Sequence, residues 1–262
     1  MDLGLTDRSY LVTGGSRGLG FATARALLAE GASVVIGARD VAVLDVAVAR
    51  LSADSPGRVV GVMTDLADPT SAERLAAAAV ARFGRLDGAL VSSGGPPSGG
   101  VLDTPDSTWR DAFESVFLGA VRVVRAAAAA MQPDAGVNGA GGSIALVLST
   151  SARQVFEGLS LSNALRPGLA MLVKDLGDQL GPRGIRVNGL VPGRIATDRT
   201  AALDARTGAP EAARRRSEAS IPLGRYGEPD EFGRVAAFVM SPAASYINGT
   251  LIAVDGGLLR LP

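Results

Sequence analysis

Short apolar runs alternate with longer amphipathic segments along nearly the whole chain, and this alternation limits the folds that the chain can adopt. The first three pairs are YLVTG with FATARALLAEG, SVVIGAR with VAVLDVAVARL, and RVVGVMTD with SAERLAAAAVARFG. Strands that are buried on both faces of a parallel sheet read as continuous apolar runs, and parallel neighbours need a crossover connection. We therefore predict alternating strands and helices.

The alternation continues with four more apolar runs: GALVSS, SIALVLS, IRVNGLVP and TLIAVDGG. Helical stretches between them cover residues 107–131, a segment ending near Leu180, and residues 232–240. These patterns predict an α/β fold, a Rossmann-type doubly wound domain whose seven-stranded parallel sheet carries helices on both faces. Because no linker interrupts the series, we expect one domain over residues 1–262.

The charge and the missing residue types exclude several classes of protein. The chain has no histidine and no cysteine, which excludes disulfides, zinc fingers and histidine-based catalysis, and we predict no metal site. Its 26 basic and 26 acidic side chains give a net charge of zero, so neither nucleic acid nor an anionic membrane is an expected partner. With no apolar run near 20 residues and no signal-like N-terminus, a cytoplasmic protein is expected.

A glycine-rich segment, TGGSRGLG at residues 13–20, follows the first apolar run and opens the first helical stretch. Glycines there let the backbone turn tightly and approach a pyrophosphate at the positive end of a helix. In this strand-to-helix context the segment is typical of a dinucleotide-binding site, the alternative being a turn without a ligand. The predicted cofactor contacts in this segment are Gly14, Ser16, Arg17, Gly18, Leu19 and Gly20.

The second apolar run ends in Arg39, where a carboxylate would accept the ribose hydroxyls of NAD. Arg39 and Arg17 form a guanidinium pair that suits a 2′-phosphate, because the planar fork binds such oxygens in pairs. The sequence therefore favours NADP(H) over NAD. Asp40 leaves an alternative open, since it either pairs with Arg39 or caps the following helix.

Further motifs follow the same order as in a known family: DL at 65–66, GIRVN at 184–188, PG at 192–193, and ING at 247–249 before VDGG at 254–257. With these motifs the chain resembles the short-chain dehydrogenase/reductase superfamily over nearly its whole length, most closely the branch of 3-oxoacyl-acyl-carrier-protein reductases. The resemblance implies that Asp65 accepts from the adenine amine and that the chain forms a dimer or a homotetramer. It adds these cofactor contacts: Asp65, Leu66, Ser93, Gly94, Pro192, Gly193, Ile195 and Thr197.

The chain departs from the family pattern where the catalytic groups are expected. The family's Tyr-x-x-x-Lys pair falls on Ser162 and Arg166, and no tyrosine in the chain has a lysine four residues later. The family's asparagine falls on Val116, and its Asn-Asn-Ala-Gly stretch reads SSGG at 92–95. The family's serine is retained as Ser149. The candidate catalytic residues are therefore Ser149, Ser162 and Arg166.

This replacement changes the chemistry that the site can perform. A serine hydroxyl is a weak acid that normally needs a separate base, whereas the family's tyrosine is positioned as the proton donor. Arg166 is a fixed cation, which can stabilise an oxyanion or bind an anion but cannot shuttle protons. We expect Ser149, Ser162 and Arg166 to polarise a carbonyl group while water delivers the proton, with weak turnover of ordinary ketones.

Structural roles for the same residues remain open at this point. Pro167 favours a helix that begins near Arg166, whereas a helix that begins near Ser162 would place Ser162 and Arg166 on one face. Ser162 is also a candidate N-cap, and Arg166 a candidate partner in a buried or interface salt bridge. Asn163 is either a cap or a substrate-binding amide.

Two segments fall outside the alternation, residues 94–100 and about 197–226. Loops at the carboxyl ends of parallel strands face the ligand crevice, so both segments are candidates for contact with a small-molecule substrate. The second includes the arginines at 214–216, for which a solvated helix face is the alternative. Residues 113–130 contain more apolar positions than one buried helical stripe needs, which predicts a homo-oligomer.

Three functions fit these residues. The first is a divergent NADP(H)-dependent oxidoreductase that acts on a carbonyl or alcohol substrate, similar to 3-oxoacyl reductases but with an altered catalytic group. The second is a redox-inactive NADP(H)-binding sensor or partner subunit. The third is non-redox, lyase-type chemistry on the same scaffold, as in halohydrin dehalogenases.

Overall fold

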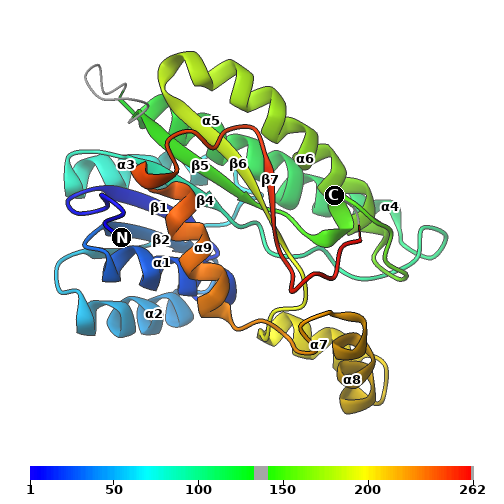
Figure 1. The fold of residues 1–262 in the computed structure, drawn as a ribbon. Helices are drawn as coiled ribbons and strands as arrows, with labels where there is room; N and C mark the ends of the chain where they lie inside the picture. The colour runs from blue at the N-terminus through cyan, green and yellow to red at the C-terminus, as the bar shows by residue number, and fades with distance from the viewer. Residues whose placement is uncertain (133–140, 261–262) are drawn as a thin grey trace.

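Seven parallel strands form one sheet in the order β3-β2-β1-β4-β5-β6-β7 (Figure 1). The computed structural model describes residues 1–132 and 141–260. The strands are β1 (Ser9–Thr13), β2 (Ser33–Ala38), β3 (Val59–Met63), β4 (Gly88–Val91), β5 (Gly142–Val147), β6 (Ile185–Pro192) and β7 (Leu251–Val254). The strand order reverses between β1 and β4, and ligands of open α/β sheets bind at such a switch point, beyond the carboxyl ends of the strands.

Helices cover both faces of the sheet, which confirms the predicted doubly wound fold. They are α1 (Gly18–Ala29), α2 (Val41–Asp54), α3 (Ser71–Phe83), α4 (Asp106–Ala112), α5 (Gly119–Ala130), α6 (Ser160–Leu180), α7 (Asp198–Ala205), α8 (Pro210–Ser220) and α9 (Pro229–Met240). One face carries α1, α2 and α9, and the opposite face carries α3, α5 and α6. No helix in the described part of the chain is long and apolar enough to cross a membrane.

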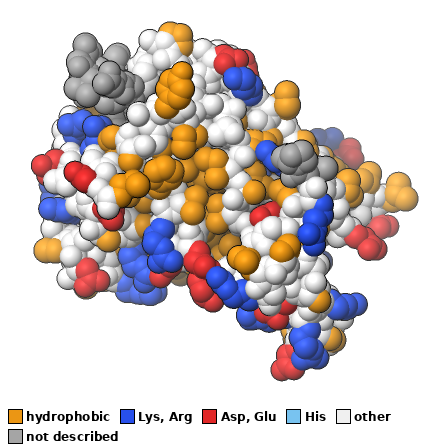
Figure 2. Space-filling view, in the orientation of Figure 1, with side chains coloured by type: hydrophobic (Ala, Val, Ile, Leu, Met, Phe, Trp, Pro, Cys, Tyr) orange, Lys and Arg blue, Asp and Glu red, His pale blue; other side chains and the backbone are white. Residues whose placement is uncertain are grey.

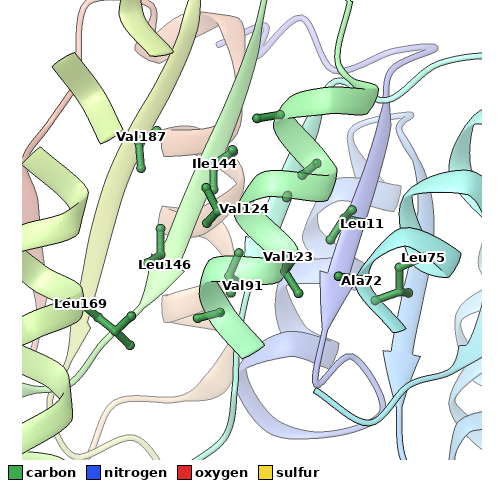
Figure 3. Close-up of a cluster of buried hydrophobic side chains, with 14 of the residues drawn as sticks. Leu11, Ala72, Leu75, Val91, Val123, Val124, Ile144, Leu146, Leu169 and Val187 are labelled. Atoms are coloured by element: carbon green, nitrogen blue, oxygen red, sulfur yellow. The ribbon is translucent and has the colours of Figure 1, made fainter. Parts of the chain in front are cut away.

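Two hydrophobic clusters, one on each face, hold the helices against the sheet. In the cluster of Figure 3, Leu11 of β1 and Ile144 of β5 face Leu75 of α3 and Val124 of α5. The second cluster joins Tyr10, Val12 and Ile36 to Phe232 of α9. Alternate residues of the strands thus point to opposite clusters, as expected for a sheet that is buried on both faces.

The segment 197–226 is mostly helical rather than a loop. Helices α7 and α8 lie within it and form a lobe that projects below the sheet in Figure 1. Arginines of the basic run pair one turn along α8, with Arg214 2.8 Å from Glu218 and Arg215 3.6 Å from Glu211. These pairs agree with the solvated-face interpretation of that run.

The helical region predicted over 107–131 is interrupted by a π-helical segment, Phe113–Leu118, between α4 and α5. Val116, which the resemblance places at the family's asparagine, lies in this segment and is buried. π-Helical segments are rare and occur frequently at functional sites. The π-helical backbone is present here, but the side chain of Val116 within it is apolar and cannot form hydrogen bonds.

Candidate active site

The glycine-rich turn has a backbone that only glycine accommodates. Gly14 and Gly18 adopt φ values of +62° and +56°, and a Cβ at Gly20 would collide with the carbonyl group of Gly14. Helix α1 begins at Gly18, and its N-cap, Arg17, leaves the first N–H groups without a side-chain acceptor. The free N–H groups lie at the positive end of the helix, and the glycines leave room for a ligand to approach the backbone. Both features suit the binding of a phosphate group.

Arg17, within this turn, and Arg39, directly after β2, are both exposed. Asp40 caps α2, since its Oδ1 accepts a hydrogen bond of 3.1 Å from the N–H of Val43. The alternative that Asp40 neutralises Arg39 is therefore not observed, and within the described residues neither arginine has an acidic partner. Both guanidinium groups are open to an anion, as a 2′-phosphate requires.

Asp65 and Leu66 follow β3 at the same edge of the sheet. Asp65 Oδ1 accepts a 3.1 Å hydrogen bond from the N–H of Ala67, which fixes the turn and leaves Oδ2 for other donors. Leu66 packs so closely on Gly119, the first residue of α5, that a Cβ there would lie 2.6 Å from the Leu66 carbonyl oxygen. Glycine at the start of α5 thus lets this turn sit against the helix.

The turn after β6, in the other half of the sheet, lies next to the glycine-rich turn. Gly193 donates a 3.0 Å hydrogen bond to the carbonyl oxygen of Val254, and Ile195 is buried. Thr197 caps α7 through its Oγ1, and a methyl group at Gly18 would lie 3.6 Å from its Cγ2. Residues predicted for the two ends of a dinucleotide therefore line one continuous edge.

Ser149 and Ser162 are joined through a third serine, Ser151. The Ser162 hydroxyl lies 2.8 Å from the Ser151 hydroxyl, and the N–H of Ser151 donates to Ser149 Oγ over 3.1 Å. Ser151 and Ser162 are buried, and Ser149 is partly exposed. Sequence reasoning missed Ser151, although its spacing two residues after Ser149 was visible.

Helix α6 begins at Ser160, seven residues before Pro167, so the proline lies inside the helix. Ser162 and Arg166 are therefore one turn apart on the same helix face. Leu159 rather than Ser162 occupies the N-cap position. Asn163 hydrogen-bonds both backbone groups of Phe156, with distances of 3.2 and 2.8 Å, and therefore holds the preceding loop rather than either role expected for it.

Arg166 is buried, with 4% of its surface exposed, and its hydrogen bonds go to uncharged groups. It donates to the carbonyl oxygen of Val147 at 2.8 Å, to Ser93 Oγ at 3.5 Å, and to the carbonyl oxygen of Gly94. No carboxylate of the described residues lies within 4.0 Å of it, so it is not a salt-bridge partner there. Its Nε has no hydrogen-bond partner among the residues that the structure describes.

Burial, and then the positive charge of Arg199, lower the pKa of Arg166 to about 10. The guanidinium is therefore still charged at neutral pH. Arg186 provides a comparison, because burial also lowers its pKa to about 10, yet it donates to the carbonyl oxygens of Val239, Ser241 and Ile247 at 2.9 to 3.1 Å. A fixed charge at Arg166 can stabilise negative charge on a carbonyl oxygen.

Arg199 is a second cation of the site that sequence reasoning did not single out. It lies in the first turn of α7 and donates to the carbonyl oxygens of Gly95 and Pro96 at 3.1 and 3.0 Å. A side chain at Gly95 would overlap its guanidinium group. The only signal in the sequence was its position in the segment that follows β6.

The chain has a doubly wound α/β fold with an open glycine-rich turn at the carboxyl ends of its strands, and comparisons with known proteins specify its family. A family model described as enoyl-(acyl carrier protein) reductase matches residues 14–259. The chain belongs to the short-chain dehydrogenase/reductase superfamily.

Three relatives illustrate the similarity. L-rhamnose 1-dehydrogenase (NAD(P)(+)) of Azotobacter vinelandii is 35% identical over 257 residues, which cover 97% of each chain. Cis-4-hydroxycyclohexanecarboxylate dehydrogenase of Sinomonas cyclohexanicum is 35% identical over 254 residues, 96% of each chain. The structure of L-sorbose reductase from Gluconobacter frateurii, complexed with NADPH and L-sorbose, superimposes with a TM-score of 0.93 at 27% identity and full coverage of both chains. The chain is thus similar to NAD(P)-dependent dehydrogenases and reductases.

Proposed function

We propose that this chain is an NADP(H)-dependent oxidoreductase that interconverts a carbonyl compound and an alcohol through an altered catalytic group. One observation carries the proposal. At the carboxyl ends of the strands, the glycine-rich turn that fits a phosphate lies at the same edge of the sheet as the side chains of Ser149, Ser162 and Arg166. The names of relatives, which refer to sugars and a hydroxylated carboxylic acid, support an alcohol or carbonyl substrate.

The proposed cofactor site uses the residues predicted from the sequence, within one domain over residues 1–262. Phosphates would bind Gly14, Ser16, Gly18, Leu19 and Gly20, and the 2′-phosphate would bind Arg17 and Arg39. Asp65, Leu66, Ser93 and Gly94 would line the adenosine and ribose side, and Pro192, Gly193, Ile195 and Thr197 the nicotinamide side. The segment 197–226 would then cover the substrate.

When bound, NADPH supplies a hydride. The chain's own groups act on the carbonyl oxygen: Ser149 and Ser162 donate hydrogen bonds, and Arg166 provides a positive charge that stays fixed because its pKa remains far above neutral. Ser151 holds the Ser162 hydroxyl in place. No described residue near these groups replaces the family's tyrosine as a proton donor, so water supplies the proton.

A redox-inactive NADP(H)-binding protein is the second candidate, because the sequence contains no Tyr-x-x-x-Lys pair. One experiment separates it from the first: calorimetric titration with NADPH, followed by initial rates of NADPH oxidation with ketones, β-ketoesters and quinones. Binding with turnover supports the oxidoreductase, and binding without turnover supports the second candidate. Absence of binding contradicts both.

Replacing Arg39 with glutamine is expected to weaken NADPH binding by about 1.5–3 kcal/mol, the range for a hydrogen bond to a charged group. NADH binding should change little, because NADH lacks the 2′-phosphate. Calorimetry on both cofactors measures the difference. Arg58→Gln is the matched control, since this exposed arginine lies at the opposite end of the sheet. Equal binding of NADH and NADPH by the parent protein would disprove the role of Arg39.

We also propose that the chain forms a homo-oligomer. Figure 2 shows hydrophobic side chains gathered over the middle of one face. Phe113, in the segment that carries the predicted apolar surplus, and Met171, in α6, are 46% and 72% exposed. Exposed apolar surface of this kind is typical of association surfaces. Light scattering at micromolar concentration should report a dimer or tetramer, and a stable monomer of 26.5 kDa would contradict the proposal.

A further inference from the structure

Two arginines from different helices hold one loop between them. Arg166 of α6 donates to the carbonyl oxygen of Gly94, and Arg199 of α7 donates to those of Gly95 and Pro96. Three consecutive carbonyl groups thus join two guanidinium groups beside the candidate catalytic serines. In the part of the chain that the structure describes, neither arginine lies within 4.0 Å of a carboxylate.

The positive charge of this pair is not compensated. Burial lowers the pKa of both arginines, and Arg199 lowers that of Arg166 in addition. Two close like charges are costly in a partly desolvated site, and an anion between them would remove that cost. Arg186 shows that carbonyl groups alone satisfy a buried guanidinium, but Arg186 has no such cationic neighbour among its contacts.

Two hydrogen-bond donors of these segments are unused. Among the described residues, the buried Nε of Arg166 has no hydrogen-bond partner, and neither has the hydroxyl of Ser98, two residues beyond Pro96. Buried polar groups without partners are rare, and a binding site for a ligand is one reason for them. Arg199 is exposed, so a ligand can reach the pair from its side.

We propose that the substrate carries a carboxylate in addition to its carbonyl group and that this carboxylate binds Arg199. The buried Arg166 contributes a second positive charge that attracts the carboxylate. The substrate class is therefore an oxo acid or the corresponding hydroxy acid. This inference rests on the proposed function and extends it from a carbonyl compound in general to an anionic one. A planar guanidinium binds a carboxylate through two parallel hydrogen bonds, which suits Arg199 as the anchor.

The test compares acetoacetate with its methyl ester, which differ in charge but share the carbonyl group. Each is titrated calorimetrically into the full chain saturated with NADP⁺, so that no reduction takes place. We expect acetoacetate to bind at least tenfold more tightly than methyl acetoacetate. Arg199→Gln should bring the ratio of the two dissociation constants close to one. Arg215→Gln, which removes the same charge from the α7–α8 lobe, should preserve the ratio.

Equal binding of acid and ester, no binding of acetoacetate, or a ratio that Arg199→Gln leaves unchanged would overturn the inference. Acetoacetate that binds only without NADP⁺ and is displaced by it would also overturn it, because the arginines would then serve a cofactor phosphate. Failure of NADP⁺ itself to bind would reject the proposed function separately. In that case the same titration of the cofactor-free chain decides whether the anion site exists.

Discussion

Replacing Arg166 with alanine is expected to lower the initial rate of NADPH-dependent carbonyl reduction by about 100- to 1000-fold. This range corresponds to about 2.7–4 kcal/mol, the effect of removing one group that stabilises a developing oxyanion. The reason is that Arg166 places a positive charge next to the candidate site. It donates to Ser93 and Gly94 and lies one turn after Ser162 on α6. Initial rates at saturating NADPH measure this loss. Ser149→Ala should also lower the rate.

A buried arginine also contributes to folding, so the loss of rate needs a matched control. Arg186→Ala removes another buried guanidinium that donates to backbone carbonyls, but at the amino-terminal end of β6, away from the candidate site. We expect both variants to lower the thermal unfolding midpoint, and only Arg166→Ala to lower the rate per folded molecule. Brisk turnover in both Arg166→Ala and Ser149→Ala would place the chemistry on other residues.

The sheet could be predicted from the sequence because its strands are buried on both faces. Each predicted apolar run became a strand, from β1 in YLVTG to β7 in TLIAVDGG. Propensity did not reveal the π-helical segment Phe113–Leu118, since its residues suit an α-helix equally well and the shift depends on packing around it. The lobe of α7 and α8 was missed for a related reason: α8 is too polar to show a clear apolar stripe.

The sequence singled out Ser149, Ser162 and Arg166 as candidates, but it did not predict how the structure arranges them. Pro167 favours a helix start near Arg166, yet α6 begins at Ser160 because contacts outside the helix hold that first turn. Leu161 and Leu165 are buried, and the preceding Leu159 pairs with Gly99 of the loop after β4. Tertiary contacts of this kind also determine the positions of Ser151 and Arg199, which no local pattern distinguishes from other serines and arginines.

The double variant Ser162→Tyr, Arg166→Lys is expected to raise the rate of carbonyl reduction by about 100- to 10,000-fold, the usual contribution of a positioned general acid. The two positions share one face of α6, one turn apart, because the helix continues through Pro167. A tyrosine hydroxyl, with a reference pKa of about 10, is a far better proton donor than serine, and a neighbouring lysine lowers that pKa.

Arg166→Lys alone should not produce this gain, since it exchanges one cation for another and leaves the proton donor missing. Initial rates of NADPH oxidation for the parent, both single variants and the double variant separate the two contributions, with NADPH affinity measured in parallel. If Arg166→Lys alone matches the double variant, the proton is not the limiting element. If the double variant binds NADPH normally and reacts no faster than the parent, the arrangement of Ser149, Ser151 and Ser162 serves chemistry other than carbonyl reduction.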